Sequence, residues 1–308
     1  MMIDTAVIVR DKTRLEQLIE RFNSKAQAKF YIERSGSSFT FYEEEHEVFY
    51  RELEVLLEKV KSLLKTKVVY REYLPSYLFS DTEIVLVFGQ DGLVANTAKY
   101  LTGQILAGIN PDSTSFDGVL LPFDSSNIYS AIKSTIKGQP NCKTVCLAKA
   151  RLSDGQELLA FNDFYIGANS HVSSRYKIKY KEDSEMHSSS GVLVSTRAGS
   201  TGWLSSVLNM ASNVGSYFGV SMPTNSSHLN QQDSDLIFSV REPFASVASQ
   251  TSIGFGIIQQ GESLTIESHM ADNGVIFSDG VEKDFLSFNT GTTVEISIHT
   301  ENVSLLIA

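Results

Sequence analysis

The chain changes character near residue 141, and this change constrains its fold more than any other feature of the sequence. Before that point, strand-like runs such as TAVIVR, KVVYREY and IVLVF alternate with helical patterns. TRLEQLIERF and a longer stretch from about Glu43 to Lys65 repeat apolar residues at helical spacing, and Ser24 to Arg34 fits either a helix or a strand. Such alternation predicts a layered, mostly parallel sheet with helices on its faces.

After residue 141, short β-branched or aromatic runs follow one another with Gly, Asp, Asn and Ser between them. They are RYKIKYK, GVLVS, DLIFSV, SLTIES, GVIFSD, TVEISIH and VSLLIA. One helical stretch, Thr201 to Asn213, interrupts them. The Ser-rich stretches at 188–190 and 225–227 are typical of loops. The sequence therefore predicts an α/β domain over residues 1–140 and a mainly β domain over residues 141–308.

Composition narrows the classes of ligand and location. The 308 residues include 26 Lys and Arg against 36 Asp and Glu, which gives a net charge of −10. An acidic chain of this kind is a poor nucleic-acid binder. Its longest apolar runs fall far short of the ~20 residues that span a bilayer, and its start does not resemble a signal peptide. We expect a soluble, cytoplasmic protein that binds neither nucleic acid nor membrane.

Cysteine and histidine give no sign of a metal site. Cys142 and Cys146 are the two cysteines, and no further ligands stand near them in the sequence. The six histidines have no metal-ligand spacing either. Ordinary buried thiols are the expected state of the cysteines, and no protein metal site is predicted.

The stretch VLVFGQDGLVANTAKY, residues 85–100, carries the first candidate site. A buried strand runs into a glycine turn and then a helix, which places backbone N–H groups and the positive helix end at the carboxyl edge of the sheet. Gly89 and Gly92 would permit a tight turn and close approach of a ligand, and Asp91 offers a carboxylate that could take a proton from a hydroxyl. A plain Asp-Gly turn is the alternative.

Two further stretches add polar groups. GVLVSTRAGSTGWLSSVLNM passes from a strand through hydroxyl-bearing residues into a helix; these hydroxyls could bind ribose or phosphate, or Ser200 or Thr201 could simply cap the helix. FNDFYIGA places Asn162 and Asp163 at the entry to a strand. This pair could bind the hydroxyls of a ribose or an adenine edge, or could form an Asx-turn.

Together these stretches resemble NAD kinases in order and spacing. The family's G-G-D-G-T, N-E or N-D, S-T-P-x-G-S-T-A-Y and terminal D-G appear here as GQDGL, Asn162 with Asp163, STRAGSTGW and FSDG. The similarity extends from about Ile84 to the C-terminus. It implies an α/β domain and an all-β domain with NAD bound between them. It also implies transfer of a phosphoryl group from ATP or polyphosphate, with Mg²⁺, to the 2′-hydroxyl of the NAD(H) adenosine ribose.

The resemblance also implies roles for individual residues. Asp91 would be the general base on that hydroxyl, and Trp203 would stand where the family has a tyrosine. The implied nucleotide-binding residues are Gly89, Gln90, Gly92, Asn162, Asp163, Ser190, Thr201, Gly202, Trp203, Ser206 and Asp279. A homodimer or homotetramer is expected from the family and from the many strand edges of a β domain.

The sequence departs from the family pattern at several of these positions. Gln90 replaces a glycine, Leu93 a threonine, and Ser190 an acid expected to contact the dinucleotide. Arg197 and Ala198 stand where proline and a small polar residue are usual, and NPDSTSFDGVLLPF replaces a glycine-rich segment. Three functions remain open: a divergent NAD kinase, a lipid or sugar kinase of the same superfamily, and a nucleotide-binding sensor without catalysis. If Asp91 is the base, its replacement by Asn should slow turnover with little effect on stability.

A basic strand is the last feature that the sequence predicts. Arg175, Lys177, Lys179 and Lys181 alternate with apolar or aromatic residues, so a strand here would place every cation on one face. This face could bind a phosphate-bearing ligand or an acidic subunit, or could be a solvated face that discourages pairing at a sheet edge.

Overall fold

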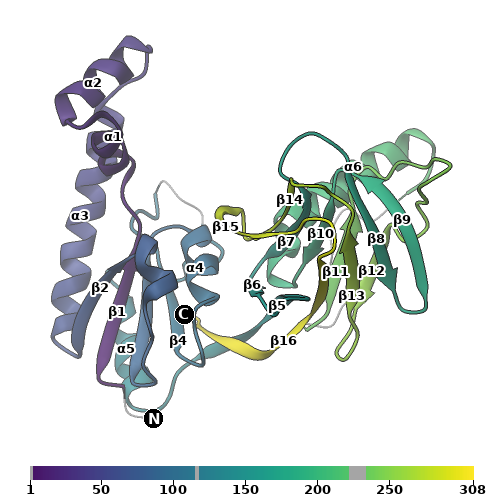
Figure 1. The fold of residues 1–308 in the computed structure, drawn as a ribbon. Helices are drawn as coiled ribbons and strands as arrows, with labels where there is room; N and C mark the ends of the chain where they lie inside the picture. The colour runs from purple at the N-terminus through teal and green to yellow at the C-terminus, as the bar shows by residue number, and fades with distance from the viewer. Residues whose placement is uncertain (1–2, 115–117, 222–233) are drawn as a thin grey trace. The chain divides into compact units, whose positions relative to one another are not determined.

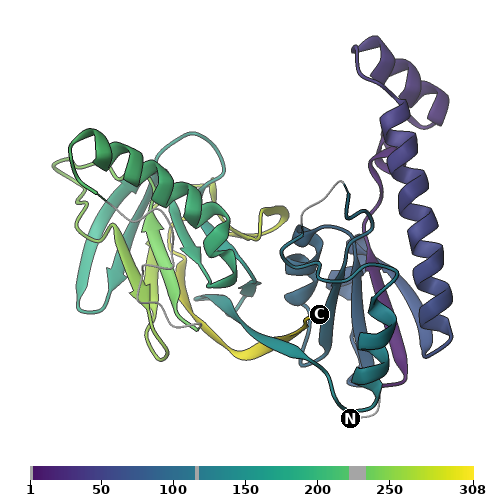
Figure 2. The ribbon, with the colours of Figure 1, turned by 180° about the vertical axis from the view of Figure 1, so that it is seen from behind.

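The computed structural model describes residues 3–114, 118–221 and 234–308, so the Ser-rich stretch at 225–227 lies outside the described residues. The chain divides into two compact units, Met1–Thr144 with Val303–Ala308, and Val145–Asn302. Figures 1 and 2 show the chain from opposite sides. The boundary predicted after residue 140 falls close to the start of the second unit. Residues 303–308, which the sequence assigned to the second domain, pack with the first unit.

The first unit is built on a parallel sheet, as the strand and helix alternation predicts. Its strands run in the order β2, β1, β3, β4, and the end of β16 pairs in parallel with β4. The bounds are β1 Thr5–Arg10, β2 Lys65–Tyr70, β3 Glu83–Phe88, β4 Ile105–Ile109 and β16 Thr293–Leu306. β1 and β3 are buried along their whole length, as is typical of strands covered on both faces.

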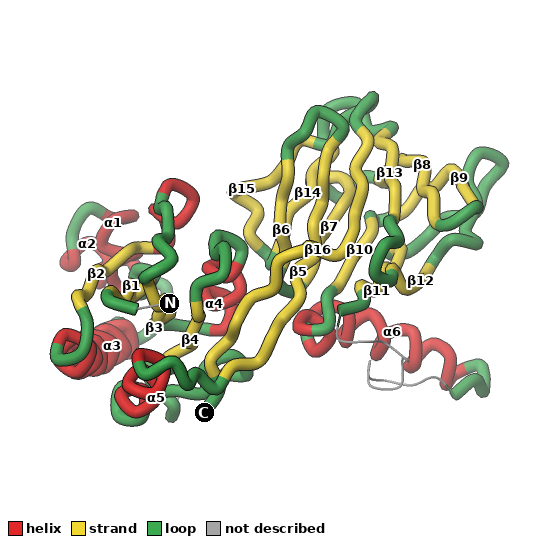
Figure 3. The backbone as a smooth tube through the Cα atoms, turned by 90° about the horizontal axis from the view of Figure 1, so that it is seen from below, coloured by secondary structure: helices red, strands yellow, loops and turns green. Residues whose placement is uncertain are grey.

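Helices cover both faces of this sheet (Figure 3). The long α3 (Thr40–Lys61) and α5 (Ile128–Ile136) pack on one face, where Leu56 and Ile132 meet Ile8 and Leu86. α4 (Asp91–Ala98) follows β3 and packs beside β3 and β4. A short helical segment, η1 (Arg71–Ser76), follows β2.

Two further helices of the first unit form a small cluster with the start of α3. They are α1 (Arg14–Phe22) and α2 (Lys25–Arg34), and the buried residues that join them to α3 are Leu15, Ala28 and Phe39. The segment that fitted either a helix or a strand is thus helical. Its helix starts at Ser24, whose side chain accepts a hydrogen bond from the Gln27 N–H.

The second unit contains two antiparallel sheets that enclose one apolar core. The first sheet runs β16, β13 (Leu264–Ser268), β8 (Ser174–Tyr180), β9 (Asp183–Ser189), and β5 (Cys142–Leu152) pairs with β16 and β6 (Glu157–Ala160). The second sheet runs β12 (Phe255–Ile258), β11 (Leu236–Val240), β10 (Val192–Ser195), β7 (Asp163–Ala168), β14 (Gly274–Ser278), β15 (Val281–Ser287). The predicted fold class is therefore confirmed: an α/β part with a mostly parallel sheet and a mainly β part.

One helix lies on the outer face of the second sheet. α6 (Trp203–Tyr217) packs Leu204 and Leu208 against Leu193 and Ile237, and the short η2 (Ala198–Thr201) precedes it (Figures 2 and 3). Within the described residues, no helix combines the length and the apolar character that crossing a membrane would require.

The basic strand is an interior strand of its sheet. β8 pairs with β13 on one side and with β9 on the other, so its cations do not protect a sheet edge. Arg175, Lys177 and Lys179 are exposed on one face, as predicted, and Lys177 lies opposite Glu267 of β13. Lys181 lies past the end of the strand and pairs with Glu262 at 3.6 Å. The interpretation of the cations as edge protection is wrong.

Candidate functional site

Asp91 is the first residue of α4, directly after the carboxyl end of β3. Its carboxylate is already engaged in the first unit: Oδ2 accepts a hydrogen bond from the Val119 N–H at 3.0 Å, and Oδ1 accepts one from the Leu120 N–H at 2.9 Å. Asp91 thus holds the segment that contains Val119 and Leu120. Each carboxylate oxygen keeps a second lone pair, so a hydroxyl could still bind, but it would share the carboxylate with this segment.

The two glycines of this loop do not have the backbone conformation that glycine favours. Neither Gly89 nor Gly92 is among the residues with positive φ, so the turn itself does not need them. A Cβ at Gly89 would lie 2.9 Å from Leu93 Cδ2, whereas one at Gly92 would meet no atom within 4 Å. Gln90 is exposed, and its side chain does not cap α4. The loop therefore offers open space at Gly92, and the Gln90 amide has no hydrogen-bond partner among the described residues.

In the second unit, Asp279 organises the turn that carries Asn162. The Asp279 carboxylate accepts hydrogen bonds from three successive backbone N–H groups, those of Phe161 at 3.1 Å, Asn162 at 2.6 Å and Asp163 at 3.3 Å. The Asp279 N–H donates in return to the Asp163 carbonyl at 2.9 Å. The FSDG and FNDF stretches, far apart in the sequence, therefore meet directly.

The STRAGSTGW stretch holds the other side of the same turn. The Thr196 N–H donates to the Asn162 carbonyl at 2.8 Å, and the Thr196 hydroxyl donates to the Phe161 carbonyl at 2.5 Å. Gly199 lies so close that a Cβ there would be 2.2 Å from the Asn162 carbonyl oxygen. The Ser195 and Thr196 hydroxyls are buried and donate to backbone carbonyls, so their protons are used to shape the turn.

The side chains of Asn162 and Asp163 are left without partners. Within the described residues, neither the Asn162 amide nor the Asp163 carboxyl makes a side-chain hydrogen bond, so the pair does not form an Asx-turn. Asp163 is only 7% exposed. Burial, with a smaller contribution from the negative charge of Asp279, raises the pKa of Asp163 to about 7. Near neutral pH this carboxyl can therefore donate as well as accept a hydrogen bond.

This burial should make the stability of the second unit depend on pH. The folded pKa of about 7 lies above the ordinary 3.8, so the folded state keeps a proton that the unfolded state loses. Ionising this buried carboxyl costs folding free energy, a cost that is absent below the ordinary pKa and complete above the folded pKa. The stability of the folded state therefore falls as pH rises between the two values. Asp163→Asn should therefore be more stable than the native chain above pH 7, by up to about 4 kcal/mol, with no such gain near pH 4. Chemical denaturation of both proteins across this range measures the difference, in which other titrating groups cancel. A constant difference would contradict the raised pKa.

The remaining predicted residues, apart from Ser190, lie around the start of α6. Thr201, Gly202 and Ser206 are exposed there, and Gly202 is the N-cap, so neither Ser200 nor Thr201 caps α6. Trp203 stacks on Tyr165 at 5.9 Å between ring centroids. Ser190 precedes β10, whereas Ser195 ends it, so Ser190 lies at the other end of that strand from the Asn162 turn.

The sequence did not single out two residues that support Trp203. Tyr165 lies under its ring, and the Arg241 guanidinium stands 5.2 Å from the ring centroid on a cation–π contact. The Tyr165 hydroxyl donates to the carbonyls of Ala168 and, at 3.3 Å, of Ser190. Side chains alternate between the two faces of β7, so Tyr165 lies on the same face as Asp163. This alternation was the sequence signal that could have identified Tyr165.

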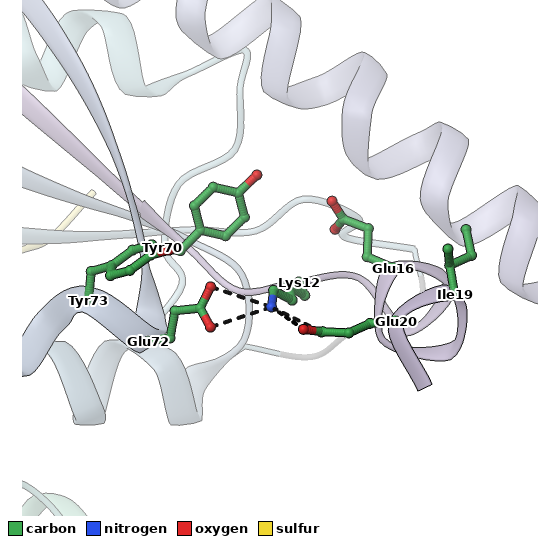
Figure 4. A pocket seen from close by; sticks show the side chains of 7 residues that line it. All are labelled: Lys12, Glu16, Ile19, Glu20, Tyr70, Glu72 and Tyr73. Atoms are coloured by element: carbon green, nitrogen blue, oxygen red, sulfur yellow. Dashed lines mark hydrogen bonds and ion pairs between the residues drawn. The ribbon is translucent and has the colours of Figure 1, made fainter. Parts of the chain in front are cut away.

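A separate cavity of 450 Å³ lies in the first unit beside the ends of β1 and β2 (Figure 4). The Lys12 ammonium fills part of it and contacts Glu20 at 3.0 Å and Glu72 at 3.4 Å. The other lining residues are Glu16, Ile19, Tyr70 and Tyr73. Carboxylates outnumber the cation that lines this cavity, so it is a poor place for a phosphate group.

The described residues do not form a protein cage for Mg²⁺. No group of three or more His, Cys, Asp or Glu side chains there could hold a metal ion. Mg²⁺ that arrives with a nucleotide is bound chiefly by phosphates and water, and it needs one or two carboxylates at most.

No model of a known protein family matches the sequence, and no curated protein is significantly similar to it. Solved structures do match. An NAD kinase from Archaeoglobus fulgidus in complex with ATP has a TM-score of 0.57 and 13% identity, over 98% of this chain and 93% of that chain. Yeast NADH kinase complexed with NADH has a TM-score of 0.56 and 11% identity, over 100% of this chain and 84% of that chain. Both units of this chain therefore share the fold of NAD kinases.

Proposed function

We propose that the chain is a divergent NAD-kinase-like phosphotransferase. It would move a phosphoryl group from ATP or polyphosphate to the 2′-hydroxyl of the adenosine ribose of NAD(H). The observation that carries the proposal is the Asn162 turn. Two motifs that are distant from it in sequence, FSDG and STRAGSTGW, hold it, and within the described residues its amide and its carboxyl have no hydrogen-bond partner. Such a pair can bind ribose hydroxyls or an adenine edge.

The proposal assigns the acid–base step to the first unit. Asp91 would accept the proton of the attacking hydroxyl, as the NAD-kinase resemblance implies. Little covalent chemistry is needed in phosphoryl transfer, so the other groups would act by positioning and by hydrogen bonding. Open space at Gly92, the exposed Gln90 amide and the start of α4 would receive the phosphates of the donor. Trp203 on Tyr165, with Thr201, Gly202 and Ser206 beside it, would contact the nucleotide.

The direct test is NADP formation by the purified chain. With NAD or NADH, Mg²⁺ and either ATP or polyphosphate, we expect NADP or NADPH to accumulate and donor phosphate to be consumed in equal amount. Omission of the donor should abolish product. A parallel panel of lipid and sugar hydroxyls with labelled ATP should remain unlabelled, and label on one of those acceptors but not on NAD would reassign the substrate class.

A second candidate function rests on the contacts of Asp91. Its carboxylate accepts two backbone hydrogen bonds, and a carboxylate used this way can be purely structural. The chain would then be a nucleotide-binding sensor without catalysis. NAD(H) or NADP(H) binding measured by calorimetry, with no product under any donor or divalent ion, would support the sensor and contradict the kinase.

A further inference from the structure

The turn that presents Asn162 and Asp163 has one carboxylate behind it. Three successive N–H groups converge on Asp279, while the Thr196 hydroxyl and N–H hold the carbonyls of the same turn. Hydrogen bonds to a charged acceptor are stronger than neutral ones. Asp279 therefore supplies the strongest of the contacts that fix this backbone.

The backbone at Asp279 is shaped for this task. Asp279 has φ of +55° and Gly280 has φ of +69°, so two successive left-handed residues turn the chain sharply after β14. Asp and Asn tolerate this conformation better than most residues with a side chain. The turn points the carboxylate back at the Asn162 backbone, where all three hydrogen bonds use its oxygens.

We propose that Asp279 is a positioning residue: it fixes the Phe161–Asp163 backbone so that Asn162 and Asp163 contact the nucleotide, and it does not contact the nucleotide itself. This inference rests on the proposed function for its ligand. It replaces the role that the family resemblance implied, which was direct binding of the nucleotide by Asp279. Its contacts with the turn are independent of any ligand.

The same geometry links Asp279 to the pKa of Asp163, a quantity that simple destabilisation of the fold would not change. Asp279 is the charged group that raises the pKa of Asp163, and the neighbouring Ser195, Thr196 and Gly199 carry no charge. Removal of the Asp279 charge should lower the pKa of Asp163. Burial of Asp163, the larger cause of its raised pKa, is not changed by this removal.

The test compares Asp279→Asn and Asp279→Ala with Glu185→Gln as the matched control. Glu185 also accepts two successive backbone N–H groups, from Ser252 and Ile253, but it lies on β9 in the other sheet of the unit. In the native chain, Oδ1 of Asp279 accepts the hydrogen bonds from the N–H groups of Asn162 and Asp163. Asp279→Asn keeps one side-chain oxygen that can accept these bonds, and asparagine also tolerates the left-handed backbone. Asp279→Ala loses every one of these bonds.

We expect NAD affinity by calorimetry to fall about 10- to 100-fold in Asp279→Ala and clearly less in Asp279→Asn. Carboxyl-detected NMR should show a lower titration midpoint of Asp163 in both variants, because both remove the Asp279 charge. Amide exchange at Asn162 should speed up in the order native, Asn, Ala. Glu185→Gln should match the native chain in all three measurements.

Two results would overturn the inference. Equal loss of affinity in both variants, with an unchanged Asp163 midpoint and unchanged Asn162 exchange, would show that Asp279 touches the nucleotide directly. Native affinity in both variants would show that the turn does not need it. If the native chain does not bind NAD at all, the proposed function fails, but the NMR titration and the amide exchange still test the positioning role. If Asp279→Ala does not fold, NAD affinity, the Asp163 titration and the Asn162 amide exchange are compared between Asp279→Asn and the native chain alone.

Discussion

NADP formation by the Asp91→Asn variant is expected to be about 10²–10⁴ times slower than by the native chain, because an amide cannot take the proton of the attacking hydroxyl. The comparison requires initial rates at saturating NAD and donor for both proteins. A fall in rate with an unchanged KM for NAD would place the loss in the chemical step. An equal rate in the variant would remove Asp91 from the mechanism.

The same variant should also be less stable, which the sequence alone did not suggest. One oxygen of the carboxylate becomes an NH₂ group that faces the N–H of Val119 or Leu120, so one hydrogen bond is replaced by two opposed donors. We expect a loss of about 1–3 kcal/mol in the free energy of unfolding. The expectation of little change in stability is therefore revised.

A control separates the carboxylate from the segment that it holds. In Gly118→Ala the new Cβ would lie 2.6 Å from the Leu121 side chain, so the segment shifts while the Asp91 carboxylate remains. This variant should lose far less turnover than Asp91→Asn. If both lose the same amount, the position of the segment, and not proton transfer at Asp91, limits the reaction.

Gly199→Ala should abolish the Asn162 turn in its present form. The added Cβ would lie 2.2 Å from the Asn162 carbonyl oxygen and 2.6 Å from its carbonyl carbon, and neither backbone atom can rotate away. We expect a loss of about 3 kcal/mol in unfolding free energy, the upper part of the usual range for overpacked interiors, together with loss of NAD binding. Denaturant titration and calorimetry measure the two effects.

The matched control for this variant is Gly254→Ala in the same unit. There the nearest atom to the new Cβ, the Thr251 carbonyl oxygen, is at 3.5 Å, an ordinary contact distance. This variant should keep native NAD affinity and nearly native stability. Native NAD binding by Gly199→Ala would show that the ligand does not depend on the Asn162 turn, and would count against the proposed nucleotide site.

Local patterns in the sequence predicted the elements but not how they are combined. TVEISIH and VSLLIA predict two strands, yet they form the single strand β16. The basic alternation of residues 175–181 correctly predicts one charged face, but whether β8 is an edge depends on β9 and β13, which pair with it from other parts of the sequence. Periodicity reports the environment of a strand's two faces and says little about its neighbours.

The candidate site divides in the same way. The sequence singled out FNDF, STRAGSTGW and FSDG, and the structure brings Asn162, Thr196 and Asp279 of these stretches into contact. What each polar group does was not readable, because a carboxylate that binds a ligand and one that binds backbone N–H groups look alike in a sequence. Asp279 and Asp91 both proved to accept backbone hydrogen bonds, while Asp163 did not.

Strand β16 gives the chain an order of assembly. Its last residues complete the parallel sheet of the first unit beside β4, and Leu306 joins the apolar core there, although all of the second unit lies between them in the sequence. During synthesis, this strand of the first unit therefore leaves the ribosome only after the second unit has done so. Until then β4 keeps an unpaired edge and the core lacks Leu306, so the nascent first unit cannot reach its mature packing before the second unit has been made.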